Sequence, residues 1–329
     1  MKVRRSIWIS AALVIAVAVI LVVIISAQNK AITFKDPNFE AMVRHQLGKP
    51  SGAIHESDIE NIKIFSVASN ISDKTTDYGT IKDLSDLEHF TGLEALMITD
   101  TEINDLSPLA KLSKLQFVSF AGCNITANLG TLSNLPGLQS LAISASQVSD
   151  LSPIGNLTKL TELHLPNLRG VGLNNLSVFS HLTNLTSLNL SGNKIHDISL
   201  LSNLTQLTNL DISYSEIRDT SPLSNLTNLT GLNLTGNQIS DITPLSRLSG
   251  LIALNLDGNQ ISNIAPLSQL TNLTTLGLSD NQISDVSPLI QNGRDGHGVT
   301  IRLYNNPLNE ESFNIYLPQL SSMGYSIQL

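Results

Sequence analysis

The sequence predicts an α/β repeat solenoid, in which every repeat adds one short strand and one tight turn to a stack. The first observation is a 22-residue pattern that recurs along most of the 329-residue chain, because a fixed period of this length is typical of stacked repeats. The second is that Leu and Ile recur at fixed places in each unit. The third is that aromatic residues make up 4% of the chain and hydrophobic residues 41%, so the core must be aliphatic. We therefore expect stacked coils instead of two or three globular domains.

The first part of each unit, L-x-x-L-x-L, predicts a short strand. Its second and third Leu are two residues apart, so they face one side of the strand, and the residues between them face the other. Stacked coils would pair these strands in parallel into one curved sheet and bury the Leu side chains. The units begin at Leu93, Leu115, Leu138, Leu160, Leu185, Leu207, Leu229, Leu251 and Leu273, and the last five starts are 22 residues apart.

A polar residue recurs where each strand ends, most often Asn. An inward-pointing amide at this place can satisfy backbone groups of the turning chain that would otherwise be buried and unpaired. Cys123 occupies the same place, and we interpret it as a structural residue instead of a reactive thiol. The predicted structural Asn ladder consists of Asn193, Asn237, Asn259, Asn281 and Asn306.

The second part of each unit has Ile, Asp and Pro at fixed places, as in Ile239, Asp241 and Pro244. Pro suits the first turn of a helix, where its missing N–H costs nothing. Because few residues remain before the next strand, we expect a short 3₁₀ turn on the other side of each coil. The recurring Asp could bind Ca²⁺ or hydrogen-bond its own turn, and we favour the turn. No metal and no cofactor are expected.

An uncharged apolar run at residues 7–26 precedes the repeats. Twenty helical residues span about 30 Å, which is the thickness of a bilayer core. Lys2, Arg4 and Arg5 stand before the run, so the positive-inside rule places the amino terminus in the cytoplasm and the repeats outside the cell. We expect a single-pass protein of the cell membrane with an uncleaved signal anchor. The alternative is a signal peptide, whose removal with residues 1–27 would give a secreted protein.

The repeat resembles that of the internalins, which are bacterial leucine-rich-repeat surface proteins. The segment from Leu229 to Leu245, LTGLNLTGNQISDITPL, carries the resemblance, which covers roughly residues 35–329. It implies a right-handed leucine-rich-repeat solenoid with 3₁₀ turns on the convex side, helical caps at both ends and a concave parallel sheet that binds a partner protein.

The residues at both ends of the repeats agree with such caps. Asp36 and Pro37 predict the start of an amino-terminal helix, and Glu310 to Met323 predict a closing helix. The expected organisation is a cytoplasmic tail (1–6), a transmembrane signal anchor or signal peptide (7–26), a linker (27–33), a helical N-cap (34–62), leucine-rich repeats (63–298) and a C-terminal cap (299–329).

The outward strand positions are mostly Ser, Thr, Asn and Gly, with few of the large residues that anchor tight protein interfaces. We expect a protein ligand on this face, and a glycan is the alternative ligand. A further alternative is that this chain is a structural envelope protein without a specific ligand. The candidate ligand-binding residues are Met97, Phe117, His164, Asp211, Tyr214, Asp257, Arg302 and Tyr304.

Charge and motif content argue against two other classes of function. Four of the 19 basic residues lie in the first thirty, which contain no acid, so the remainder has 15 basic and 27 acidic residues and a net charge of −12. Such a surface repels phosphate backbones, and nucleic acid is not an expected partner. The sequence has no nucleophile elbow, phosphate loop or H-E-x-x-H motif. We therefore expect no catalytic residues and a membrane-tethered recognition or adhesion module instead of an enzyme.

Overall fold

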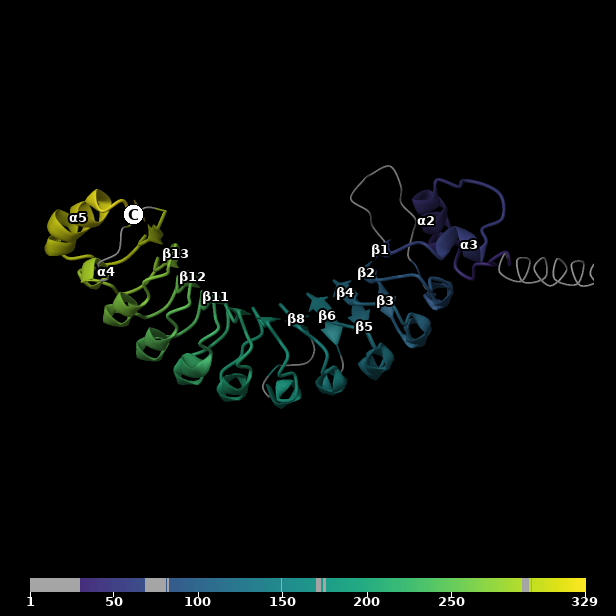
Figure 1. Ribbon diagram of the computed structural model, residues 1–329, viewed down its shortest axis with the longest axis horizontal. Coiled ribbons are helices and arrows are strands. Elements are labelled where there is room, and N and C mark those ends of the chain that lie inside the picture. The colour runs from purple at the N-terminus through teal and green to yellow at the C-terminus, as the bar shows by residue number, and fades with distance from the viewer. Residues whose placement is uncertain are drawn as a thin grey trace, which may run out of the picture.

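The computed structural model describes residues 30–68, 81, 83–148, 150–169, 173, 176–291, 296 and 298–329. These residues form one long arc, with strands along its concave side and short helical turns along its convex side (Figure 1). The predicted right-handed leucine-rich-repeat solenoid is confirmed.

A twelve-stranded sheet, in which all the pairs of strands are parallel, forms the concave side. Consecutive coils contribute neighbouring strands, because each coil returns the chain to the same face one strand further along. The strands, in order, are β1 (Ile64–Ala68), β2 (Ala95–Thr99), β4 (Phe117–Ala121), β6 (Ser140–Ser144), β8 (Glu162–His164), β9 (Ser187–Asn189), β10 (Asn209–Asp211), β11 (Gly231–Asn233), β12 (Ala253–Asn255), β13 (Thr275–Gly277), β14 (Thr300–Arg302) and β15 (Ser326–Gln328).

The register of the sheet stacks equivalent residues of successive repeats. Leu210 pairs with Leu232, and Leu232 pairs with Leu254. All three side chains are buried. Because the period is 22 residues, every repeat places its Leu residues on those of its neighbours, and one continuous aliphatic core runs through the arc.

Short 3₁₀ helices form most of the turns on the convex side, and several have Pro in their first turn. Pro108, Pro153, Pro222, Pro244 and Pro266 occupy this place. The turns are η1 (Ser85–His89), η2 (Ser107–Lys111), η3 (Leu129–Asn134), η4 (Ser152–Asn156), η5 (Leu176–Phe179), η6 (Ser199–Asn203), η7 (Ser221–Asn225), η8 (Thr243–Arg247) and η9 (Ala265–Gln269), and α4 (Pro288–Gln291) takes the corresponding place after β13.

A second, three-stranded parallel sheet lies beside the first three complete coils, and the repeat pattern did not predict it. Its strands are β3 (Glu102–Ile103), β5 (Asn124–Ile125) and β7 (Gln147–Val148). The residues that form it lie three and four places after the end of the concave strand. In the later coils the same places have no strand, so the repeat is not uniform along the arc.

Both ends of the solenoid are covered. Asp36 caps helix α2 (Pro37–Leu47) by accepting hydrogen bonds from the backbone of Asn38 and Phe39. The Phe39 ring then packs on Phe65 and Phe90, which closes the first coil with aromatic side chains. A second, one-turn helix, α3 (Glu56–Ile59), follows.

At the other end, a π-helical segment, η10 (Ser312–Tyr316), continues into helix α5 (Leu317–Ser322). The closing helix predicted from Glu310 to Met323 corresponds to these two segments. The chain then adds strand β15 to β14, which the sequence did not predict.

The predicted single-pass location at the cell membrane is corrected by the structure. Throughout the described residues, no helix is both long and apolar enough to span a bilayer. The predicted anchor itself, residues 7–26, lies outside them.

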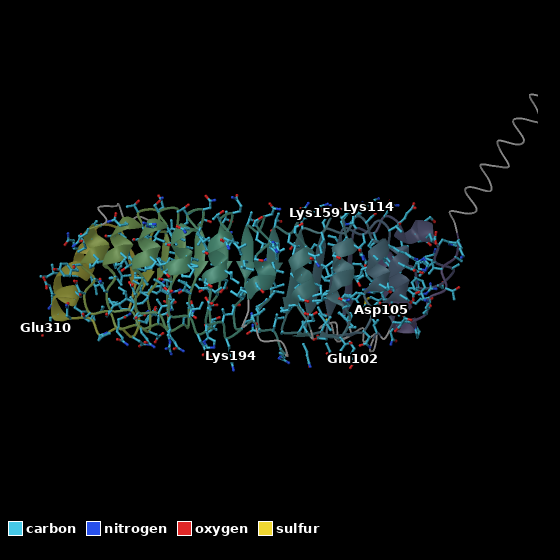
Figure 2. The ribbon with its side chains drawn as sticks, turned by 90° about the horizontal axis from the view of Figure 1, so that it is seen from below. Glu102, Asp105, Lys114, Lys159, Lys194 and Glu310 are labelled. Carbon is cyan, nitrogen blue, oxygen red and sulfur yellow. The ribbon has the colours of Figure 1, made fainter. Side chains whose placement is uncertain are left out.

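Charged side chains lie along the two long edges of the solenoid. Figure 2, which views the convex side, shows Lys114 and Lys159 at one edge and Glu102 and Lys194 at the other.

Candidate functional site

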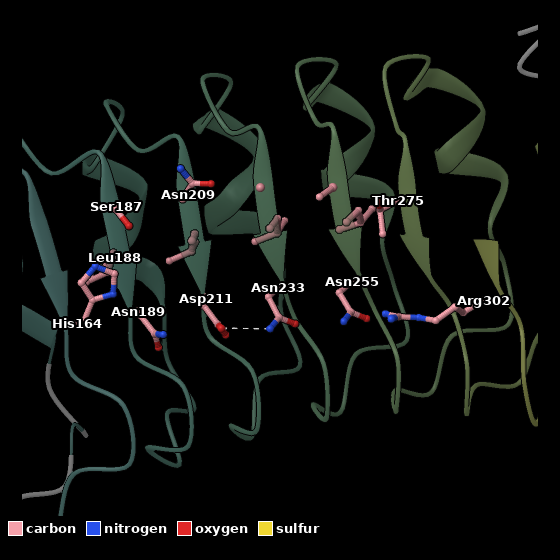
Figure 3. A pocket seen from close by; sticks show the side chains of 15 residues that line it. His164, Ser187, Leu188, Asn189, Asn209, Asp211, Asn233, Asn255, Thr275 and Arg302 are labelled. Atoms are coloured by element: carbon pink, nitrogen blue, oxygen red, sulfur yellow. Dashed lines mark hydrogen bonds between the residues drawn. The ribbon is translucent and has the colours of Figure 1, made fainter. Parts of the chain in front are cut away.

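A shallow groove of about 420 Å³ runs across the concave sheet from β8 to β14 (Figure 3). Residues from seven successive strands line it, so no single repeat forms it. The lining residues are His164, Ser187, Leu188, Asn189, Asn209, Leu210, Asp211, Gly231, Leu232, Asn233, Ala253, Leu254, Asn255, Thr275 and Arg302.

The last residues of these strands form one row across the groove. Because the strands pair in register, each residue of the row lies beside its equivalent in the next coil. The row runs His164, Asn189, Asp211, Asn233, Asn255, Gly277 and Arg302. A cation at its carboxyl-terminal end and amides and a carboxylate at its centre face the same space.

Hydrogen bonds to their own turns hold the central side chains of this row. One oxygen of Asp211 accepts from the backbone N–H of Ser213 at 3.0 Å and from its hydroxyl at 2.7 Å. Asn189 makes the same pair of bonds with Ser191, and Asn233 makes it with Thr235. The Asn233 amide also donates to Asp211 at 3.1 Å. The polar groups of the groove are thus fixed before a ligand arrives.

An ion pair crosses the groove floor near its carboxyl-terminal end. Nη2 of Arg302, on β14, lies 2.7 Å from Oδ2 of Asp257, which follows β12. The intervening strand β13 has Gly277 at the crossing point. A Cβ there would lie closest to Asn255 Oδ1, 2.6 Å from Arg302 Nη2 and 2.7 Å from Asp257 Oδ1, so a larger residue would force these side chains to move. Oδ1 of Asp257 also accepts from the backbone of Ser279 at 2.7 Å.

One rim of the groove consists of residues with a left-handed backbone. Gly192, Gly236 and Gly258 have φ angles of 73°, 68° and 69°, as expected for a conformation that favours glycine. Tyr214 occupies the equivalent place with φ 51°, and 67% of its surface is exposed. A bulky side chain at this place is therefore a departure from the repeat.

The eight candidate ligand-binding residues do not form one cluster. His164, Asp211 and Arg302 line the groove, Asp257 pairs with Arg302, and Tyr214 stands at the rim. Exposed Tyr304 follows β14. The remaining two, Met97 on β2 and Phe117 on β4, lie beyond the amino-terminal end of the groove. Sequence reasoning missed Gly277. Its lack of a side chain, in the repeat between those of Asp257 and Arg302, was a usable signal.

The ladder Asn residues lie inside the turns and connect neighbouring coils. The Asn237 amide donates to the carbonyls of Ile212 and Leu234 at 3.0 Å, and its oxygen accepts from Ile217 N–H at 3.1 Å. Asn193, Asn259, Asn281 and Asn306 repeat this pattern. These residues hold the backbone beneath the groove.

Cys123 is buried at the same ladder place. Its thiol lies 3.4 Å from the carbonyl of Ile98. Burial raises the pKa of this thiol, and hydrogen bonding to the backbone only partly opposes the rise. A protonated, inaccessible sulfur suits a structural role and not a nucleophilic one.

Asp side chains on the convex side cap the 3₁₀ turns. Asp105 and Asp219 accept from the backbone N–H of the residue two places later, at 2.7 and 2.8 Å, and Asp285 does the same at 2.8 Å before helix α4. Hydrogen bonds from the Ser107 backbone and hydroxyl lower the pKa of Asp105. Among the described residues, no three His, Cys, Asp or Glu side chains are grouped as metal ligands would be.

Comparison with known proteins places these features in a family context. The family model described as leucine-rich repeats (2 copies) matches residues 183–225, 205–247 and 249–291. An internalin, InlF, from Listeria monocytogenes shares 28% sequence identity over 90% of this chain and 96% of its own, with a TM-score of 0.68. The chain is an internalin-like leucine-rich-repeat protein.

Other solved structures share the fold of this internalin-like chain. The functional domain of InlJ from Listeria monocytogenes, which includes a cysteine ladder, is 21% identical over 85% of this chain and 64% of its own, with a TM-score of 0.58. The ectodomain of the Arabidopsis thaliana receptor kinase GASSHO1/SCHENGEN3, solved with Casparian strip integrity factor 2, is 22% identical over 76% of this chain and 30% of its own, with a TM-score of 0.60. No curated protein matches the chain.

Proposed function

We propose that this protein is a non-catalytic binding module that holds a protein partner on its concave face. The observation that carries the proposal is the groove across β8 to β14, whose polar side chains are fixed by their own turns. Solenoid proteins use such extended concave surfaces for binding. A surface that is already ordered loses little side-chain entropy on association, which favours affinity.

The composition of the groove indicates a small or moderately tight contact. Tight protein interfaces depend on a few large anchors, and the large groups near this groove are His164, Arg302, Tyr214 and Tyr304. The remaining lining consists of amide, hydroxyl and aliphatic groups and the carboxylate of Asp211. Its amides and hydroxyls favour a glycan as the second candidate ligand.

Arrays of purified proteins and of glycans, probed with the full chain, test the proposal. We expect saturable binding to a protein, and we expect the combined variant Phe117→Ala, Tyr214→Ala and Tyr304→Ala to lose it without unfolding. A matched convex-side variant, Asn225→Ala, Arg247→Ala and Gln269→Ala, should bind as the unchanged chain does. Retention of binding by the concave variant would show that the concave face is not the site. Saturable binding to glycans alone would replace the protein partner, and no saturable ligand would favour a structural spacer.

A further inference from the structure

Around the end of its strand, the coil of residues 207–228 departs from both neighbours at four places, of which Ile212 for Leu is a conservative change in the core. Residues 188–193 read LNLSGN and residues 232–237 read LNLTGN, whereas residues 210–215 read LDISYS. The changes put Asp211, Tyr214 and Ser215 where both neighbouring coils have Asn, Gly and Asn. Because the coils are stacked in register, the neighbours show what the fold itself requires at each place.

Asp211 carries a charge that its turn does not need. Its hydrogen bonds to Ser213 are the same as those that neutral Asn189 makes with Ser191 and Asn233 makes with Thr235. No cation of the described residues forms an ion pair with it, in contrast to Asp257, which Arg302 neutralises. A carboxylate has about four acceptor sites, and three neutral donors reach this one.

Tyr214 has a conformation that disfavours it. A φ of 51° is uncommon for a bulky residue, and both neighbouring coils relieve it with glycine. The absence of side chains at Gly192 and Gly236 leaves the ring uncovered, and one ring edge lies over Gly236. The ring is 67% exposed, so it adds little to the core.

Ser215 completes the set. Its hydroxyl is buried and has no hydrogen-bond partner within the described part of the chain, whereas Asn193 and Asn237 at the equivalent places connect two coils. Three residues of one segment thus depart from the repeat at a cost: Asp211 adds a charge without a cation partner, Tyr214 adopts an unfavourable φ, and Ser215 lacks the hydrogen bonds of the Asn ladder. Strain that persists in one exposed segment is a sign of function at that segment.

We infer that Asp211 and Tyr214 form a subsite that takes a basic side chain, Lys or Arg, of the bound protein. This inference rests on the proposed function and specifies the chemistry of the partner. A cation over a Tyr ring is attracted by the electrons of the ring face, and a carboxylate without a cation partner attracts the same group. The charge of −12 over residues 31–329 steers basic partners toward the solenoid.

Two variants that copy the neighbouring coils test the subsite with little risk of misfolding. Asp211→Asn keeps the turn that Asn189 and Asn233 make, and Tyr214→Gly restores the glycine of Gly192 and Gly236. The matched control is Ala145→Gly, which relieves a φ of 50° at the equivalent rim position of another coil and removes no ring.

A probe that requires no knowledge of the natural ligand is a library of random linear peptides, panned on the immobilised full chain. We expect peptides with Lys or Arg to be enriched on the unchanged chain and on Ala145→Gly, and not on the other two variants. For a synthetic peptide from the enriched pool, Tyr214→Gly should weaken binding about five-fold and Asp211→Asn about ten-fold. Replacing its arginine by uncharged citrulline should give the same loss.

The outcomes separate this inference from the function on which it rests. Enrichment of peptides without basic residues, lost in the triple concave variant but not in Asp211→Asn, would overturn the subsite and leave the concave face as the binding site. Recovery of uncharged glycans that require Tyr214 would also overturn it. If nothing binds saturably, both the subsite and the proposed function fail.

Discussion

The residue that ends each concave strand decides how well two coils are connected. Where it is Asn, the side chain satisfies a backbone N–H and two carbonyls, as Asn237 does. Where it is Ser215, the hydroxyl is buried without a partner in the described structure. The aliphatic core is similar in coils with Asn and in the coil with Ser215, so we expect any difference in their stability to come from hydrogen bonding.

Ser215→Asn should therefore raise the free energy of unfolding by about 1 kcal/mol, the net contribution of an added buried hydrogen bond. The new amide would lie between Asn193 and Asn237 and continue the ladder through this coil. Urea denaturation of both forms measures the change. The converse variant, Asn237→Ser, should lose more than this amount because it leaves backbone groups unpaired. A lower midpoint for Ser215→Asn would show that the coil has no room for an amide.

Gly277 lies where the ion pair between Arg302 and Asp257 crosses strand β13. Gly277→Ala places a methyl group against Arg302 and Asp257, so we expect it to break the pair. Because both side chains are partly exposed, the loss should be about 0.5–1 kcal/mol. A double-mutant cycle with Asp257→Asn measures it. The two substitutions should not add, and full additivity would mean that the pair survives beside alanine.

At the scale of the element, an Asp or Asn oxygen accepts a backbone N–H at the start of most of the 3₁₀ turns. Asp241 accepts from the backbone of Thr243 at 2.8 Å, and hydrogen bonds from the Thr243 hydroxyl and then its N–H lower the pKa of Asp241. Hydrogen bonds from the Ser199 N–H and then its hydroxyl lower the pKa of Asp197. Asn263 caps the next turn through Ala265 N–H at 3.0 Å without a charge. The turn requires only an oxygen that accepts the hydrogen bond, which Asp and Asn both provide, but of the two only Asp is ionisable.

Acidification should therefore loosen the convex side. A carboxylate whose pKa is lower in the folded state stabilises the fold above its unfolded pKa of about 3.9, and this stabilisation is lost as pH falls through the folded pKa. We expect the thermal midpoint to fall below pH 4, with a smaller fall when Asp105, Asp197 and Asp241 are all replaced by Asn. Equal pH dependence in both proteins would show that other groups control acid unfolding.

At the scale of the whole molecule, stability depends on contacts between neighbouring coils. Leu234 is fully buried in the core in the middle of the arc, and in a one-dimensional stack a coil packs on its neighbours. Leu234→Ala should cost about 2–5 kcal/mol through lost burial and the cavity that remains. Ile252→Ala, at a position that is 48% exposed, should change stability by less than about 0.5 kcal/mol. Denaturant unfolding monitored by circular dichroism compares the two, and equal losses would contradict a core confined to the Leu ladder.

The sequence by itself determined the architecture of this protein. A 22-residue period with Leu at fixed places states which side chains face the core and which face outward, since local geometry alone sets the direction of each side chain. Asp36 with Pro37 likewise predicted the start of α2, because capping depends on residues a few places apart. The outward rows of the concave sheet, from which the candidate residues were taken, follow from the same period.

Only the tertiary structure decided which of these residues meet. The pairing of Arg302 with Asp257 depends on the reach of the Arg302 side chain over Gly277, which belongs to the coil between theirs. Strands β1 and β15, and the second sheet β3-β5-β7, add edges that no repeat motif encodes. The extent of the groove depends on how far the stack curves. Periodicity fixes orientation within a coil, whereas contacts between coils depend on packing that the order of residues does not state.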